Sequence, residues 1–418
     1  MPSALESLAA LVQDPVLSVQ AETRMERLRL HIADTLGMIL QGSALAEART
    51  AMACGSRLAG WCASARLTEA DEIHLTSCTT PGSVVVPAAL YLASRGAFAT
   101  WGEFVTAALA GYQTLLRLGY AIDGPRILAR KIWPTLFAAA AGAAAVASRA
   151  WKLDGPQTAG ALATALAAST GIAPPAMASD SSRCIALGFA AEYGVFAAMA
   201  AKQGALGDVQ LVERHAGRIA GVRISPRKLL EDSRTRFFFD EVGLKPYPIA
   251  RQGLAAVEAC RDLAGRDPKG ISAITVSVPA AQARIINHPS WPANRMQSIA
   301  GIQYQIALAL LAPERLMDFA RTPPFATPAL RTLAAKVRVR EDARLEPQYP
   351  DAWPARVVVE RSGKRQSAFV SVPRGDARNP MEWEEILVKA AEYRAVLTPI
   401  RTTNPRDAIP QQMLDALP

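Results

Sequence analysis

Apolar residues recur at helical spacing through about the first 240 residues of the chain. One helix is predicted from Met25 to Leu40, ending at Gly42, and another from Phe104 to Leu118. His31 lies on the apolar stripe of the first helix, so we interpret it as a core or interface histidine rather than as a ligand.

Three further segments are rich in alanine, and small residues at this spacing allow helix backbones to approach closely. They read LFAAAAGAAAVASRAW, AGALATALAAS and GFAAEYGVFAAMAAKQG, and we expect them to be buried central helices. A loop is predicted from Gly171 to Ser182 because Pro174 and Pro175 break any helix. Arg183 follows this loop, and a cation that enters a buried helix needs an anion. That anion is either a ligand or an internal acid such as Asp180 or Glu192.

The pattern changes after Phe237. Strands alternating apolar and polar residues are predicted over 271–278, 335–339, 355–361 and 366–372, with a hairpin turn at 362–364. Helices are predicted over 250–263, 297–311 and 381–391. We therefore predict a mainly α fold with a large all-helical domain over 1–244, to which 391–418 return, and a smaller α+β domain over 245–390.

Composition narrows the class of protein. Half of the 418 residues are apolar, and the five cysteines show no metal-binding or disulfide spacing. The N-terminus lacks the basic start of a signal peptide, and the longest apolar run, 136–147, is too short to span a bilayer. These features predict a cytoplasmic protein that is not in a membrane.

The formal net charge is +9, and the basic residues are spread along the chain without a basic run. We therefore expect no nucleic-acid partner. A field that attracts small anionic substrates and an ordinary charged surface are both compatible with this distribution.

A polar stretch from Thr68 to Pro87 lies between apolar segments, and it reads TEADEIHLTSCTTPGSVVVP. Apolar flanks hold such a stretch rigid, as a binding loop requires. Thr, Ser and Asp also favour helix N-termini, so a loop that only caps a helix explains the same residues. The sequence leaves both interpretations open.

The common nucleotide, metalloprotease and serine-hydrolase motifs are absent from the sequence. Dinucleotide redox, nucleotide hydrolysis and serine-hydrolase chemistry therefore lack their usual residues, and four histidines without a His/Cys cluster argue against a metal. Several isolated polar residues remain, namely Asp71, His74, Thr80, Arg183, Lys245 and Tyr304. Arg binds carboxylates, Lys and His transfer protons, and Tyr donates to an oxyanion, which together suit proton abstraction beside a carboxylate. Taken singly, each residue is also explained as a structural polar group.

Many stretches, taken in order, resemble the MmgE/PrpD family, whose members include 2-methylcitrate dehydratase, cis-aconitate decarboxylase and iminodisuccinate epimerase. They are DEIHLTSCTTPGSVVVPAALYLA, GYQTLLRLG, WPTLFAAAAGAAA, RCIALGFAAEYGVFAAMAAKQGALG, KPYPIARQGLAAVEA, IQYQIALALL and GDARNPMEWEEILVKA. The resemblance covers most of the chain. It implies a helical domain, an α+β lid domain, an active site in the cleft between them, a homodimer and no cofactor.

Position by position, the family's acid corresponds to Asp71 or to Glu72, its lysine to Lys245 and its tyrosine to Tyr304. Three positions depart from the family. Thr80 and Trp133 stand where dehydratases and decarboxylases have histidines, and Arg183 stands where they have lysine. Losing both histidines removes two acid–base groups, which argues against 2-methylcitrate dehydration and cis-aconitate decarboxylation.

The resemblance thus implies a cofactor-independent lyase or isomerase that removes a proton next to a carboxylate of a small organic acid. The expected catalytic residues are Lys245, Tyr304, His74 and Asp71, with Lys245 or His74 as the base. The expected substrate-binding residues are Arg183, Thr80, Trp133, Thr79 and Arg251. The alternative is a member that binds a small anionic ligand without turnover. We also expect a homodimer formed by the helical domain, because its apolar surface exceeds what one such domain buries.

Overall fold

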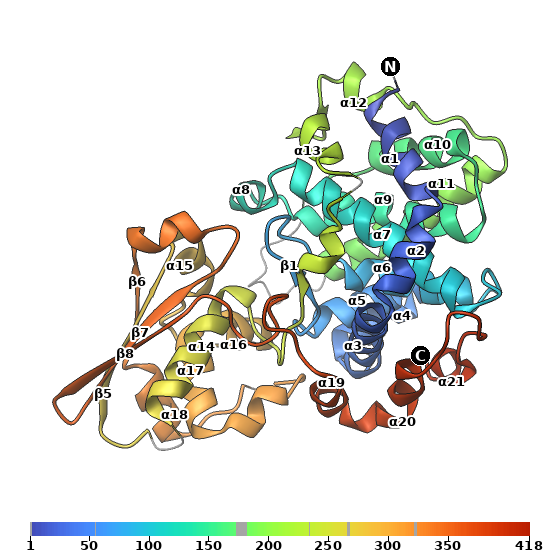
Figure 1. Cartoon of the computed structure of the whole chain (residues 1–418). Helices are drawn as coiled ribbons and strands as arrows, with labels where there is room; N and C mark the ends of the chain where they lie inside the picture. The colour runs from blue at the N-terminus through green and yellow to red at the C-terminus, as the bar shows by residue number, and fades with distance from the viewer. Residues whose placement is uncertain (1, 55, 173–181, 234, 266–267, 322–323) are drawn as a thin grey trace. The chain divides into compact units, whose positions relative to one another are not determined.

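The computed structural model describes residues 2–54, 56–172, 182–233, 235–265, 268–321 and 324–418 (Figure 1). The chain divides into two compact units. The first comprises Met1–Pro174, Ser181–Val242 and Glu382–Pro418, and the second, within the described residues, comprises Gly243–Met381.

The first unit is mainly helical, which confirms the predicted fold class. Its helices are α1 (Ala4–Gln13), α2 (Val16–Thr23), α3 (Met25–Ser43), α4 (Ala46–Ala53), α5 (Arg57–Leu67), α6 (Gly82–Ala93), α7 (Trp101–Ala121), α8 (Gly124–Ala129), α9 (Pro134–Ala150), α10 (Gly155–Ala167), α11 (Ser182–Lys202), α12 (Leu211–Arg214), α13 (Pro226–Leu230), the short 3-10 helix η1 (Phe238–Glu241), α19 (Trp383–Lys389), α20 (Arg394–Leu397) and α21 (Gln411–Asp415). The expectation of an all-helical domain is wrong in detail. Two-residue strands also occur, namely β1 (Ile73–His74) and the antiparallel pair β2 (Arg218–Ile219) and β3 (Val222–Arg223).

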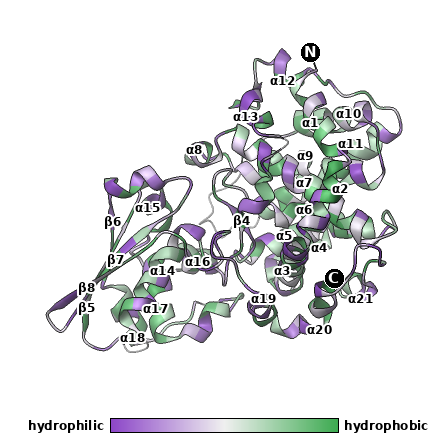
Figure 2. Cartoon of the chain, viewed as in Figure 1, coloured by the Kyte–Doolittle hydropathy of each residue, from purple (hydrophilic) through white to green (hydrophobic). Residues whose placement is uncertain are grey.

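The alanine-rich helices α9, α10 and α11 pack together (Figure 1), and α9 and α10 are largely buried, as predicted. The prediction of a buried helix is wrong for α11, in which Phe189, Phe196 and Met199 are exposed. A Cβ on Gly194 of α11 would lie 2.0 Å from the carbonyl oxygen of Ala140 in α9. Glycine is therefore required for this close approach. Figure 2 shows mostly apolar residues along these central helices and more polar ones along the peripheral α12 and α13.

Two predicted boundaries in this unit are wrong. Gly42 does not end α3, which continues to Ser43; instead, a Cβ on Gly42 would meet the carbonyl of Ser64 in α5 at 1.9 Å. Helix α6 begins at Gly82 and contains Pro87, which we assigned to the preceding loop. A proline in the second turn removes a single backbone hydrogen bond, and this fully buried helix tolerates that loss.

Among the described residues, one helix, α11, is long and apolar enough to cross a membrane, and 50% of its apolar stretch is buried in the structure. Core helices of soluble proteins are often equally long and apolar, so these features alone are weak evidence for a membrane-spanning helix.

The second unit contains a four-stranded sheet in the order β6-β5-β7-β8, in which β5 and β6 are parallel and the other pairs antiparallel. The strands are β5 (Ile271–Val278), β6 (Val337–Glu341), β7 (Ala355–Arg361) and β8 (Lys364–Val370), and all four were predicted within two residues at either end. The helices are α14 (Arg251–Ala264), α15 (Ala280–Ile286), α16 (Arg295–Ala300), α17 (Ile302–Leu311), α18 (Pro328–Ala334) and the 3-10 helices η2 (Pro313–Met317) and η3 (Ala343–Gln348).

Inward residues of the strands form one core with α14 and α17. The single helix predicted over 297–311 is wrong, because Gly301 has an extended backbone and separates α16 from α17. The break leaves the carbonyls of Ser298 and Ile299 free of helix bonding, and the Gln305 side chain donates to both.

Candidate functional site

Charged side chains that almost never lie inside proteins gather where α5 ends in the first unit. Arg66 Nη1 is 2.9 Å from Glu69 Oε2 and 3.1 Å from Asp71 Oδ1. Arg183, in the first turn of α11, makes an ion pair through Nη2 with Glu69 Oε1. All four residues are buried. Two cations and two acids therefore balance one another inside the unit.

Trp133, just before α9, forms the floor of this cluster. The Arg66 and Arg183 guanidinium carbons lie 5.5 and 5.6 Å from its ring centroid, which is cation–π distance. The sequence-predicted residues Asp71, Trp133 and Arg183 are thus brought together. The partner of Arg183 is Glu69 and not Glu192, while Asp180 lies outside the described residues.

The resemblance would place histidines at Thr80 and Trp133, and Thr80 contacts a residue close to Trp133. The Thr80 backbone N–H donates to Thr135 Oγ1 at 3.0 Å, and the two threonine hydroxyls are 3.3 Å apart. Thr135 lies two residues beyond Trp133, so both departures from the family occur in the same buried region. Hydroxyl groups there can hydrogen-bond, but they do not titrate near neutral pH.

Glu72 points into a different buried site from that of its neighbour Asp71. Its Oε2 lies 2.5 Å from Nδ1 of His31 in α3. Burial raises the pKa of Glu72 to about 8 and lowers the pKa of His31 well below its usual value. At neutral pH the pair is therefore a neutral acid that donates a hydrogen bond to a neutral imidazole. Gly82 is required here, since a Cβ would approach Glu72 Oε1 to 2.4 Å.

A buried lysine from the C-terminal part of the unit reaches the same region. Lys389 Nζ lies 2.7 Å from Asp34 Oδ1 and donates to the carbonyl of Ala70 at 2.6 Å. This contact fixes the backbone immediately before Asp71. Sequence reasoning missed Asp34 and Lys389, although a lysine in the apolar run ILVKA is a signal that could have indicated Lys389.

His74 lies in a third network. The Ser77 N–H donates to Nδ1 at 3.2 Å and the Ser77 hydroxyl lies 2.8 Å from the same nitrogen, while Nε2 lies 3.3 Å from Glu241 Oε2. Because Nδ1 accepts from the backbone, we assign the ring proton to Nε2, which then donates to Glu241. Burial lowers the pKa of His74. Both ring nitrogens are occupied, so His74 is held neutral in position.

Glu241 extends this network, since Arg236 contacts its two oxygens at 2.7 and 2.9 Å. Burial acts to raise the pKa of Glu241, but the hydrogen bonds from His74 and Arg236 prevail and lower it to about 2. On the other side, the Ser77 hydroxyl lies 2.6 Å from that of Thr79. Thr79 is therefore engaged with the His74 network rather than with the arginine cluster.

The remaining sequence-predicted residues lie in the second unit. Lys245 is buried in the segment before α14. The Tyr304 hydroxyl on α17 donates to the carbonyl of Phe325 at 3.1 Å, and burial raises the pKa of this tyrosine. Arg251 Nη2 on α14 lies 2.9 Å from Asp376 Oδ2. These three residues thus lie on separate elements of the unit, and Arg251 is held by an internal acid.

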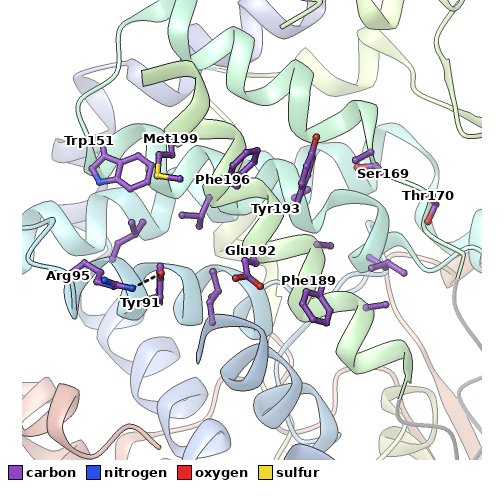
Figure 3. Close-up of a pocket in the computed structure, with 18 of the residues that line it drawn as sticks. Tyr91, Arg95, Trp151, Ser169, Thr170, Phe189, Glu192, Tyr193, Phe196 and Met199 are labelled. Atoms are coloured by element: carbon purple, nitrogen blue, oxygen red, sulfur yellow. Dashed lines mark hydrogen bonds between the residues drawn. The ribbon is translucent and has the colours of Figure 1, made fainter. Parts of the chain in front are cut away.

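A groove of about 1050 Å³ lies along α11 in the first unit (Figure 3). Phe189, Phe196 and Met199 project from α11 along it, and they are 45%, 52% and 46% exposed. Across the groove, Arg95 donates to the Tyr91 hydroxyl at 3.2 Å. The lining is mostly apolar, unlike the buried charged cluster.

The chain thus combines a mainly α unit, a smaller sheet-containing unit, and buried acid–arginine and acid–histidine sites. Residues 59–227 match the MmgE/PrpD N-terminal domain and residues 247–408 match the MmgE/PrpD C-terminal domain. The chain therefore belongs to the MmgE/PrpD family, whose members are generally enzymes such as dehydratases. No individual curated protein matches the chain.

Proposed function

We propose that the protein is a cofactor-independent lyase or isomerase that abstracts a proton next to a carboxylate of a small organic acid. The observation that carries this proposal is the Arg66–Glu69–Arg183 arrangement over Trp133. Glu69 places a carboxylate between two guanidinium groups on an aromatic floor, and a substrate carboxylate would find the same donors there.

Under this proposal Arg183 anchors the substrate by exchanging Glu69 for the substrate carboxylate, and Trp133 and Thr80 shape the site. Thr79, in the His74 network, is not part of it. Asp71 fixes Arg66, and the neutral Glu72 stores a proton close by. Because both nitrogens of His74 are engaged, Lys245 is the better candidate for the base. Lys245 as base, Tyr304 as acid, Arg251 as a substrate contact and the lid role of the second unit come from the family resemblance.

The direct test is a screen of small di- and tricarboxylates and imino acids in deuterium oxide. Solvent deuterium uptake at the carbon beside a carboxylate, seen by mass spectrometry, supports proton abstraction. It should be lost in Lys245→Met, with Lys269→Met as the matched control.

A second candidate function, binding of a small anion without turnover, is favoured by the absence of histidine at Thr80 and Trp133. Binding without deuterium uptake would select it. In both cases we predict that Arg183→Ala weakens the ligand by about 2–4 kcal/mol and that Arg183→Lys recovers part of this. A lower melting temperature with unchanged affinity would instead make Arg183 a structural partner of Glu69.

We also propose that the protein is a cytoplasmic homodimer in which the α11 groove is covered by a second copy. The exposed Phe189, Phe196 and Met199 form an apolar surface of the kind that marks interfaces. Sedimentation should give a dimer for the native chain and a monomer for Phe196→Glu; a stable monomer at micromolar concentration for the native chain contradicts the proposal.

A further inference from the structure

A second cavity of the first unit, of about 310 Å³, is separate from the charged cluster. It is enclosed by α1, α2, α7 and the residues that lead into η1. Leu8, Val12 and Leu17 give it an apolar wall on the α1–α2 side. Helices α1 and α2 pack on α7 (Figure 1). The volume is at the lower end of the range for small-molecule sites.

The opposite wall contains a buried cation without an acid partner. Arg117 on α7 is 2% exposed. Among the described residues, its guanidinium donates to the backbone carbonyls of Leu229 at 3.2 Å, Glu231 at 2.9 Å and Arg236 at 3.0 Å, and it lies 5.0 Å from the ring centroid of Phe238. Within the described part of the chain, no carboxylate forms an ion pair with it. A buried charge of this kind is costly unless an anion compensates it.

The neighbouring charges do not supply that anion. Arg236 also lines the cavity, but its charge is balanced by Glu241. Asp14, the one acid in the lining, accepts a hydrogen bond from the Val16 N–H at 2.9 Å at the start of α2. Burial and then repulsion from Arg236 lower the pKa of Arg117 to about 10, with exposed Asp232 opposing this more weakly. Arg117 is therefore still protonated at neutral pH.

We propose that this cavity binds a small amphipathic carboxylate with a short alkyl chain. The head group supplies the missing anion beside Arg117, and the alkyl chain lies against Leu8, Val12 and Leu17. An apolar wall facing a few polar and charged groups, here including Arg117 and Arg236, is the usual composition of such a site. The site is distinct from the one proposed for catalysis, and its ligand need not be a substrate.

The cavity wall is physically connected to the His74 network. Arg236, in the wall, holds Glu241, which contacts His74. Gln113, also in the wall, accepts the backbone N–H of Phe238 at 3.3 Å, in the same 3-10 helix as Glu241. An anion beside Arg117 changes the field at Arg236, so occupancy of the cavity alters the environment of His74.

The test is calorimetric titration of the full-length chain with acetate, butyrate, hexanoate and octanoate at fixed pH and ionic strength. We expect affinity to rise by about fourfold per added methylene until the cavity is full. Hexan-1-ol, which lacks the charge, should bind about 30-fold more weakly than hexanoate. Equal affinity for acetate and hexanoate, or for hexanoate and hexan-1-ol, overturns the proposal.

Variants locate the site. Ala110 lines the cavity and is 1% exposed, so Ala110→Leu fills the space and should abolish hexanoate binding. Arg117→Gln should weaken hexanoate by about 30-fold, and Arg126→Gln, which removes an exposed charge from α8, should not. If Arg117→Gln fails to fold, Ala110→Leu decides. Unchanged binding by Ala110→Leu shows that the ligand lies elsewhere.

The expected effect of cavity occupancy on His74 is measured separately, through the ring resonances of the histidines. The chain has four histidines, so the His74 ring resonances can be assigned by comparison with His74→Gln. Hexanoate should shift the His74 resonances more than those of exposed His215. Binding that leaves His74 unshifted contradicts the connection while leaving the site intact.

Discussion

Asp71 and Glu72 are adjacent in the chain, yet their side chains enter two buried sites of opposite character. Asp71 contacts the Arg66 guanidinium, in a cluster where two arginines balance two acids. Glu72 contacts the neutral His31, and burial raises its pKa to about 8. Both carboxyls are buried, but Asp71 has a guanidinium beside it and Glu72 has an imidazole.

The difference has a functional consequence. A balanced ionic cluster offers positive groups to a substrate anion, whereas a neutral buried acid is a source of one proton. Because Asp71 and Glu72 are adjacent, one short segment contributes both to an anion-binding cluster and to a proton source. The predictions below alter one site at a time.

The largest effect is expected from Arg66→Met. It leaves Glu69 and Asp71 buried with one of their cations removed, and the free energy of unfolding should fall by about 3–5 kcal/mol. Urea titration followed by circular dichroism measures this. Arg126→Met, at a side chain that is 88% exposed, is the control and should change stability by no more than about 0.5 kcal/mol.

Lys389→Met tests the contacts that fix the backbone just before Asp71 and Glu72. It leaves Asp34 buried without its cation and frees the carbonyl of Ala70, so we expect a loss of about 3 kcal/mol. Adding Asp34→Asn to the same chain should restore part of the loss, because the uncompensated charge is then gone. If the double variant is as unstable as the sum of the two singles, the ion pair is not the cause.

The sequence predicted much of this architecture but little of the charge pattern. The valine-rich run over 355–361 and the hairpin turn after it were enough to locate β7, and alanine spacing was enough to locate the packed helices. Two predicted helix boundaries were wrong. Tertiary packing tolerates Pro87 inside α6, and Gly301 interrupts the helix predicted over 297–311. The protonation state of Glu72 depends on its contact with His31, which is distant in the chain. No local sequence pattern predicts that contact.

Replacing each acid by its neutral amide should lower the free energy of unfolding by different amounts at the two sites. Asp71→Asn removes a charged partner of Arg66 and should cost about 2 kcal/mol at pH 7. Glu72→Gln replaces one neutral group by another and should cost under about 1 kcal/mol. Equal costs would show that both carboxyls are ionised, contrary to the comparison drawn above.

A smaller effect is expected in the pH dependence of stability. Because the pKa of Glu72 is raised in the folded state, its stabilising contribution is present at low pH and is lost between pH 4.5 and about 8. His31 and His74 have lowered pKa values in the folded state, so their contributions rise with pH up to about 6.5. Between pH 6.5 and 8 the histidine contributions are constant and the Glu72 contribution falls, while burial also raises the pKa of Asp34.

In that interval the free energy of unfolding should fall by about 1 kcal/mol per pH unit in the native chain. Glu72→Gln should reduce this slope by about 1 kcal/mol per pH unit, and Glu69→Gln should leave it unchanged. Chemical denaturation at half-unit pH steps gives the answer. A flat native profile contradicts the raised pKa of Glu72.

The most direct measurement of the central claim is the infrared spectrum of the carboxyl groups at pH 7, taken as the difference between the native chain and Glu72→Gln. The account predicts that the native chain shows one additional protonated carboxyl band, which disappears as the pH is raised through about 8. If Glu72→Gln also removes a carboxylate band at pH 7, Glu72 is ionised and the contrast between the two neighbouring acids does not exist.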